Sequence, residues 1–167
     1  MNGRTQYCLP CINKDDIKEI LFDNVIVTGS DRNRQYGLSS VKLQMFCIEK
    51  LLQTKRPFIV EGNFDNEYST PYFSHLLEKY NYKALQIICQ TDFLELCKRC
   101  RDRDLSPDRH PGHKEANYNE IEFGIYLKKH NYKMELINCR TIYLDTTNFD
   151  TMRIEEMTKE IEIILEQ

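Results

Sequence analysis

The stretch FIVEGN, residues 58–63, is an apolar run that ends directly in a glutamate and a glycine. A continuous apolar run of this kind predicts a strand that is buried on both faces of a parallel sheet. Residues 85–89 and 141–144 are two further runs, and segments long enough for helices separate all three. Strands that alternate with helices predict an α/β fold, a parallel sheet in three layers with helices on both faces.

The segments between these runs carry helix signals. Apolar residues recur at helical spacing after Asn13, which is placed to cap a helix, and again over residues 38–52. Thr70 before Pro71 predicts a helix that begins there, because proline at the first helical position removes no donor that the helix needs. Further helices are expected over residues 92–103, 118–129 and 151–166, and a loop is expected over residues 105–116.

Length and composition bound the class of protein. A chain of 167 residues, 41% of them hydrophobic, fits one globular domain over residues 1–167. A net charge of −3 and a pI near 5.8 argue against general nucleic-acid binding, which needs a basic excess. No apolar run approaches the ~20 residues of a membrane span, and the first residues lack the apolar core of a signal peptide. We expect a cytoplasmic protein with no membrane partner.

The chain has seven cysteines, and in a reducing compartment free thiols are expected. Cys8 with Cys11 and Cys97 with Cys100 have C-x-x-C spacing, but the two pairs lie much further apart in the chain than the pairs of a zinc ribbon. No metal site is predicted, and a cysteine-based zinc or redox protein stays as an alternative hypothesis. The other three cysteines have apolar neighbours and are expected in the core: Cys47, Cys89 and Cys139.

The turn NKDD, residues 13–16, places two carboxylates where a strand is expected to end and a helix to begin. Ligands of open α/β sheets bind at the carboxyl ends of strands, and a carboxylate there can accept a proton from an attacking hydroxyl. The alternative is that these carboxylates cap the helix and interact with its dipole. Capping is the preferred interpretation for Asp16, and both interpretations stay open for Asp15.

Glu61 is the second candidate acid, because it follows the apolar run directly. A carboxylate at this place can hold a Mg²⁺-bound water or orient an acceptor molecule, and Gly62 would let a ligand approach the backbone. The alternative interpretation is an ordinary turn from strand to loop.

A dense cationic segment begins within the helix that is expected over residues 92–103 and continues into the next loop. Its members are Lys98, Arg99, Arg101, Arg103 and Arg109. Phosphoryl transfer spreads negative charge over the transferred group, so catalysis relies on cations that close over it. Three interleaved aspartates can instead pair with these cations on a solvated helix face. The stretch RHPGH, residues 109–113, favours a lid that covers phosphates over a metal site at His110 and His113.

Together these segments resemble the small-molecule and polynucleotide kinase branch of the P-loop kinases, which includes zeta-toxin-like and gluconate-kinase-like domains. The resemblance covers residues 11–113 and, to a lesser extent, residues 141–150. It implies that ATP and Mg²⁺ are the cofactors and that the acceptor is a small molecule, which the sequence does not identify. It implies catalytic roles for Asp15, Arg103 and Arg109.

The same resemblance assigns the binding residues. On the acceptor side they are Asp16, Lys18, Glu61 and Asn63. In a lid over about residues 104–116 and the helix before it, the residues that contact the nucleotide are Arg99, Arg103, His110 and His113.

One departure from that branch is large. Its members begin with a strand, a glycine-rich loop and a helix, roughly 25–30 residues ahead of the equivalent of the NKDD turn. Here only 12 residues precede Asn13, and no G-x-x-x-x-G-K-[ST] pattern occurs anywhere. That loop holds the β- and γ-phosphates and the metal. We therefore expect a chain without the first, central strand, which binds ATP poorly and needs a further segment or a partner chain to complete the sheet.

Two hypotheses follow from this departure. In the first, the chain is an ATP-dependent phosphotransferase family member that is inactive in this shortened form. In the second, it is a pseudokinase that keeps the acceptor pocket and acts as a binding or regulatory module.

Overall fold

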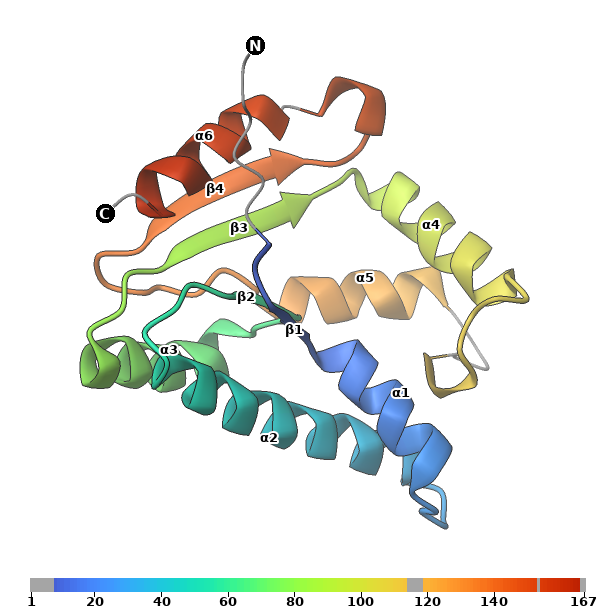
Figure 1. The fold of residues 1–167 in the computed structure, drawn as a ribbon. Coiled ribbons are helices and arrows are strands. Elements are labelled where there is room, and N and C mark those ends of the chain that lie inside the picture. The colour runs from blue at the N-terminus through green and yellow to red at the C-terminus, as the bar shows by residue number, and fades with distance from the viewer. Residues whose placement is uncertain (1–7, 114–118, 153, 166–167) are drawn as a thin grey trace. The chain divides into compact units, whose positions relative to one another are not determined.

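The computed structural model describes residues 8–113, 119–152 and 154–165. The chain divides into two compact units, Met1–Gly62 and Asn63–Gln167, and each is described by itself (Figure 1). The mixed α/β class predicted from the sequence is confirmed, because helices alternate with short parallel strands. The three-layer sheet and the single-domain organisation stay predictions.

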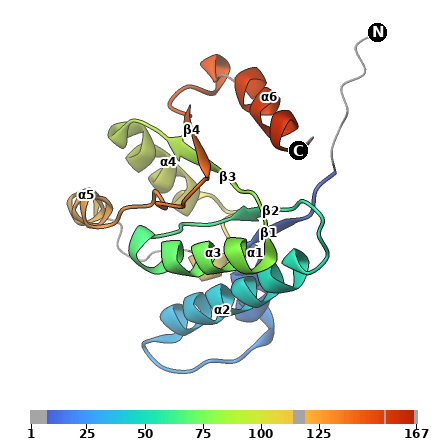
Figure 2. The ribbon, with the colours of Figure 1, turned by 90° about the vertical axis from the view of Figure 1, so that its left-hand side faces the viewer.

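The first unit contains two strands and two helices. They are β1 (Cys11–Asn13), α1 (Lys14–Asn24), α2 (Arg32–Leu52) and β2 (Ile59–Glu61). The strands pair in parallel, with Ile12 beside Val60, and α2 packs against both β1 and α1 (Figure 2). The buried face of α2 is a row with a spacing of four residues, as expected for one side of a helix: Tyr36, Ser40, Gln44, Ile48 and Leu52.

Helix α1 begins where the sequence predicts. The side chain of Asn13 accepts a hydrogen bond from the backbone N–H of Asp15 at 2.8 Å, which satisfies one of the free donors at the helix start. The loop between α1 and α2 is held by Tyr36, whose hydroxyl donates to the carbonyl of Val25 and accepts from the N–H of Val27. These contacts fix the end of α1 relative to α2.

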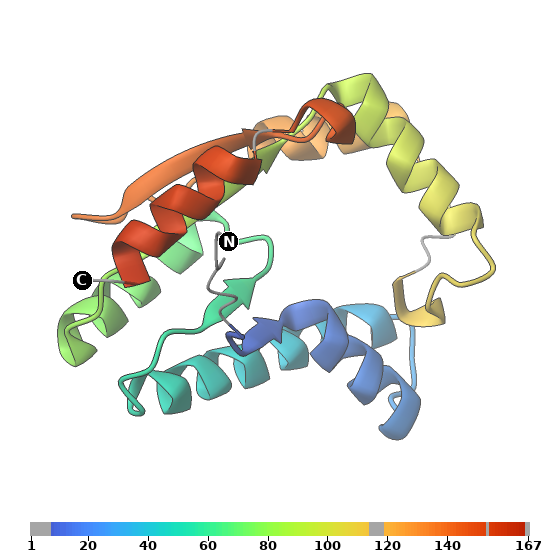
Figure 3. The same cartoon turned by 45° about the horizontal axis from the view of Figure 1, so that its top comes forward.

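The second unit contains the remaining elements. They are α3 (Asn66–Tyr80), β3 (Leu85–Gln90), α4 (Phe93–Leu105), η1 (Pro111–His113), α5 (Glu120–Lys129), β4 (Arg140–Asp145), η2 (Phe149–Thr151) and α6 (Ile154–Leu165). Strands β3 and β4 pair in parallel over their whole length, and α6 runs beside β4 (Figure 3). The buried side chain of Gln86 on β3 donates to the carbonyl of Met134 and accepts from its N–H, so an extended segment is fastened to the sheet.

The N-terminus of α3 makes a second long-range connection in this unit. Asp65 caps α3 by accepting from the N–H of Glu67 at 3.0 Å, and its other carboxylate oxygen lies 2.8 Å from Nδ1 of His130. The N–H of Asn66 donates to the carbonyl of Asn131 at 2.7 Å. These bonds join the start of α3 to the end of α5.

Three predictions about the elements are wrong. Helix α3 begins at Asn66 rather than at Thr70, because the Asp65 cap starts it a turn earlier and Pro71 is accommodated inside the helix. Residues 58–60 do not form a strand buried on both faces: Ile59 is 49% exposed, on the same side of the β1–β2 pair as the exposed Cys11. Cys89 is exposed rather than in the core, because it lies on β3, which pairs with β4 alone among the described residues.

Two further observations concern the expected sheet and the membrane. Within the described residues, β2 and β3 belong to different two-stranded sheets and share no ladder. The expectation that the chain lacks a central strand, and that a further segment or a partner chain completes the sheet, stays a prediction. In the part of the chain that the structure describes, no helix is both long and apolar enough to span a bilayer.

Candidate functional site

The acidic residues predicted on the acceptor side lie where β1 and β2 end. Asn13 and Glu61 are register partners at the last position of each strand. Asp15 follows two residues later in the first turn of α1, where the helix dipole favours a negative charge. Adjacent parallel strands deliver their carboxyl ends to one edge, so Asp15 and Glu61 lie close enough to interact.

The electrostatics of Glu61 reflect this arrangement. Partial burial is the main cause that raises the pKa of its carboxyl above 4.5, and the negative charge of Asp15 is the next. Asp16 adds to the rise, whereas Lys14 opposes it. The ammonium of Lys14 lies 2.8 Å from Oδ1 of Asp15. One cation therefore accompanies three acids, namely Asp15 and Asp16 in the turn and Glu61 at the end of β2. Such a set can bind a hydroxyl group and accept its proton.

The other acceptor-side residues differ in exposure. Asp16 is exposed and Lys18 is half-buried, both on α1. Asn63 is exposed and begins the second unit. The structure therefore brings together Asp15, Asp16 and Glu61 within the first unit.

The arginines predicted for the nucleotide side have three different environments within the second unit. Arg99 is engaged: it bonds Glu95 at 2.8 Å and the carbonyl of Thr147 at 2.9 Å, and its guanidinium lies 4.3 Å from the centre of the Phe149 ring. Arg103 is exposed on α4 and makes only a long contact, 3.8 Å, with the sulfur of Cys100 among the contacts that we resolve for it.

Arg109 is folded back onto the end of α4. Its guanidinium lies 3.5 Å from the carboxylate of Asp104, and both side chains are less than one-fifth exposed. It also donates to the carbonyl of His113 at 3.4 Å. Nδ1 of His110 accepts from the N–H of Gly112, and the rings of His110 and His113 lie 6.0 Å apart. The turn over residues 109–113 therefore holds Arg109 and both histidines close together.

The expected lid is described only in part, because residues 114–116 lie outside the described residues. Where it is described, η1 interrupts the loop that the sequence predicts over residues 105–116. In the described ranges, no three His, Cys, Asp or Glu side chains gather closely enough to hold a metal ion.

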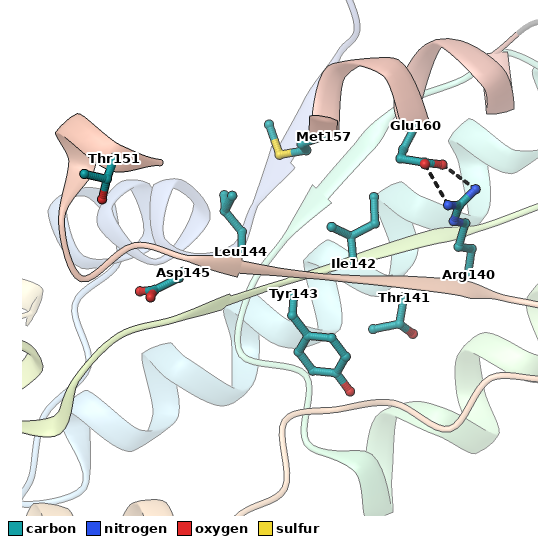
Figure 4. Close-up of a pocket in the computed structure, with 9 residues that line it drawn as sticks. All are labelled: Arg140, Thr141, Ile142, Tyr143, Leu144, Asp145, Thr151, Met157 and Glu160. Atoms are coloured by element: carbon teal, nitrogen blue, oxygen red, sulfur yellow. Dashed lines mark hydrogen bonds and ion pairs between the residues drawn. The ribbon is translucent and has the colours of Figure 1, made fainter. Parts of the chain in front are cut away.

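A cavity of about 480 Å³ lies between β4 and α6 (Figure 4). Ile142, Leu144 and Met157 form its apolar part, and an ion pair between Arg140 and Glu160 lies at one end. None of the site residues predicted from the sequence lines this cavity. It carries no cluster of acids or bases that would do chemistry, and we assign the candidate site to the strand ends of the first unit.

Gln44 is a residue of this site that the sequence reasoning missed. Its side chain is 1% exposed and bonds the carbonyl of Glu61 at 2.7 Å. A signal was present in the sequence: Gln44 occupies the same helical row as Ile48 and Leu52, where an apolar residue is the ordinary choice.

Comparisons with known proteins support the class of fold. No family model matches the chain, and no curated protein matches it. One solved structure that it resembles is a crystal structure described as a "putative kinase" from Chloroflexus aurantiacus J-10-fl. The two share 21% sequence identity with a TM-score of 0.80, over 94% of this chain and 84% of that one. The chain therefore has a kinase-like fold, and at this identity the likeness concerns the fold alone.

Proposed function

We propose that this chain belongs to the ATP-dependent phosphotransferases that act on small molecules or nucleotides. The observation that carries the proposal is the meeting of Asp15 and Glu61 at the ends of two adjacent parallel strands. The kinase-like fold supports it, because ligands of such sheets bind at this edge.

The acceptor chemistry follows from the two carboxylates. Asp15, whose carboxyl group lies beside the ammonium of Lys14, accepts the proton of the acceptor hydroxyl as the hydroxyl attacks the phosphoryl group. Glu61 orients the acceptor or a metal-bound water at the next strand end. Asp16 and Lys18 extend the acceptor side in this proposal, and the role of Asn63, which begins the second unit, stays a prediction from the sequence.

The donor set suits Mg²⁺ in a limited way. Mg²⁺ takes one or two protein carboxylates and completes its shell with water and phosphate oxygens, so Glu61 is a suitable contact through water. When bound, the ion would neutralise charge that develops on the phosphoryl group.

The fit to ATP is incomplete, because the sequence of 167 residues contains no glycine-rich G-x-x-x-x-G-K-[ST] pattern. Such a loop supplies the largest set of phosphate donors in these enzymes. We propose that the 167-residue chain alone binds ATP poorly and transfers phosphate slowly.

The proposed lid contributes cations of unequal availability. Arg103 is exposed, and within the described residues its resolved contact is the long one to Cys100, whereas Arg109 must first leave Asp104. Arg99 holds the loop after β4 against α4 and gives up three contacts if it turns to a nucleotide. His110 and His113 stand beside Arg109 in the same turn.

A second candidate function is a non-catalytic binding module. The contacts that occupy Arg99 and Arg109 within the chain favour it. In that case the carboxylates of Asp15 and Glu61 would bind a ligand without transferring phosphate to it.

A pair of proteins separates these functions. We expect the 167-residue chain to hydrolyse Mg²⁺-ATP little, and a fusion that supplies a strand, a glycine-rich loop and a helix ahead of it to gain hydrolysis. The fused segment with its loop lysine replaced by alanine is the matched control. Robust ATP turnover by the unfused chain would refute poor ATP binding. A fusion that binds ATP but never turns it over would favour the binding module.

A further inference from the structure

Gln44 is one of the most deeply buried polar side chains of the first unit, at 1% exposure. It lies between Ser40 and Ile48 in the buried row of α2. An amide enclosed in this way costs free energy unless its donors find acceptors, so its partners indicate its role.

Those partners are the ends of two strands. Nε2 of Gln44 donates to the carbonyl oxygen of Ile12 at 3.2 Å and to that of Glu61 at 2.7 Å. Ile12 lies on β1 and directly precedes Asn13, the residue that caps α1. Glu61 ends β2 and is itself an acid of the candidate site. The amide of Gln44 therefore bonds the end of β1, which leads into the turn with Asp15, and the end of β2, where Glu61 lies.

The ladder between these strands is short. It pairs only three residues of β1 with three of β2, so its own hydrogen bonds restrain the strand ends weakly. Gln44 on α2 donates one hydrogen bond to each strand, and these two bonds add a restraint that so short a ladder lacks.

We propose that Gln44 is a positioning residue, whose amide fixes the separation of the Asp15 and Glu61 carboxylates by holding the two strand ends together. This inference rests on the proposed function, because it assigns Gln44 to the same acceptor site. The two bonds described join Gln44 to backbone carbonyl groups. Gln44 therefore acts on the substrate indirectly, by positioning the carboxylates of Asp15 and Glu61.

Two other buried polar residues show what a purely structural role would be. The hydroxyl of Ser40 donates to the carbonyl of Gly37 at 2.8 Å, within the same helix. Gln86, in the second unit, bonds Met134 and Thr141 and contacts no candidate site residue through these bonds. Both side chains are buried, yet neither holds a strand end that carries an acid of the site.

The test compares Gln44→Met, Ser40→Ala and Gln86→Met in the full 167-residue chain. Methionine keeps roughly the shape of glutamine and removes its donors. The readout is the titration midpoint of the Glu61 carboxyl, followed by carbon NMR as a function of pH. We expect the midpoint to fall toward 4.5 in Gln44→Met, because the freed strand end moves the Glu61 carboxylate away from Asp15, whose negative charge helps to raise its pKa. We expect Ser40→Ala and Gln86→Met to leave it at the value of the parent.

An unchanged midpoint in a folded Gln44→Met protein would overturn the proposal, and so would an equal fall in Gln86→Met. If Gln44→Met does not fold, Gln44→Asn decides, since it keeps the amide and shortens its reach by one methylene group. A folded Gln44→Asn protein with a lowered midpoint supports positioning. An unfolded one, or one with an unchanged midpoint, would show that Gln44 is structural.

Failure of the proposed function gives a different result. Phosphoryl transfer would then be absent from every variant of the fused protein, while the midpoint of Glu61 would still respond to Gln44→Met. If transfer occurs, Gln44→Met should lower kcat by about 10- to 100-fold, as replacement of other supporting groups does. The KM for ATP should stay unchanged, because Gln44 acts on the acceptor side.

Discussion

Replacing Asp65 is expected to weaken the second unit by more than the loss of a helix cap alone. One oxygen of Asp65 caps α3 through the N–H of Glu67, and the other lies 2.8 Å from Nδ1 of His130. The side chains of Asp65 and His130 are 18% and 28% exposed, so water screens their interaction only in part. Asp65 therefore makes two contacts, one with the nearby Glu67 and one with the distant His130, and each contributes to stability.

The magnitude follows from the two contacts. Loss of an N-cap costs about 1 kcal/mol. The bond to His130 contributes about 1 kcal/mol once partial exposure is allowed for. Asp65→Ala should therefore lower the free energy of unfolding by about 2 kcal/mol, which corresponds to a fall in Tm of roughly 4–8 °C for a chain of this size. Asp65→Ser keeps a good cap and loses His130, so it should cost about half as much.

Asp92→Ala is the matched control. Asp92 caps α4 by accepting from the N–H groups of Leu94 and Glu95, and no histidine contacts it in the bonds that we resolve for the described chain. Its loss should cost about 1 kcal/mol. Urea unfolding of the three variants, with a double-mutant cycle between Asp65→Ser and His130→Ala, measures both terms. The reasoning is refuted if Asp65→Ala costs no more than Asp92→Ala, or if the cycle shows no coupling.

Three further tests concern other parts of the structure. Ile48→Ala should cost about 2–5 kcal/mol because Ile48 is 1% exposed, whereas Ile26→Ala at 93% exposure should change stability by less than about 0.5 kcal/mol; equal effects in urea unfolding would contradict the α2 core. The pKa of Glu61 is raised in the folded protein, so stability falls as pH rises from 4.5 through the raised pKa. Glu61→Gln should therefore raise Tm at pH 7 and make little difference well below pH 4.5, and a Tm lower than that of the parent at pH 7 would exclude this linkage. Arg109→Ala should lower Tm while Arg103→Ala leaves it unchanged, since Arg109 pairs with the largely buried Asp104 carboxylate and Arg103 makes no such pair among the described residues; the opposite order would reverse their assignments.

Local signals predicted the helix start at Asn13 and the ends of β1 and β2 better than they predicted burial. The Asn13 cap and the two strands that end at Asn13 and Glu61 depend on residues close together in the chain, and all of them are found. The exposure of Ile59 depends on what covers the sheet, which an apolar run does not encode. The Thr70–Pro71 pair predicts a helix start because it is a distinctive local pattern, whereas the cap at Asp65, where α3 does begin, has none as strong.

Contacts between residues that are far apart in the chain could not be predicted from the sequence. The bond from Asp65 to His130 spans 65 positions, and the bond from Gln44 to Ile12 spans 32. Spacing patterns describe one helix or strand at a time, so they give no information on such pairs. The burial of Gln44 could have been predicted in part, because a polar residue in the buried row of a helix indicates a specific hydrogen-bond partner, although the pattern does not identify that partner.

Phosphoryl transfer to an acceptor by Asp15→Asn tests the central proposal most directly. The assay uses the fused protein that supplies a glycine-rich loop, γ-labelled ATP with Mg²⁺, and a panel of sugars, nucleosides and amino alcohols as hydroxyl acceptors. Asp16→Asn removes the same charge from the same turn and is the control. We predict that Asp15→Asn lowers kcat by about 100-fold or more, the contribution of a general base, while Asp16→Asn has a smaller effect. Equal turnover in the parent and Asp15→Asn, or no transfer by the parent to any acceptor, would contradict the account.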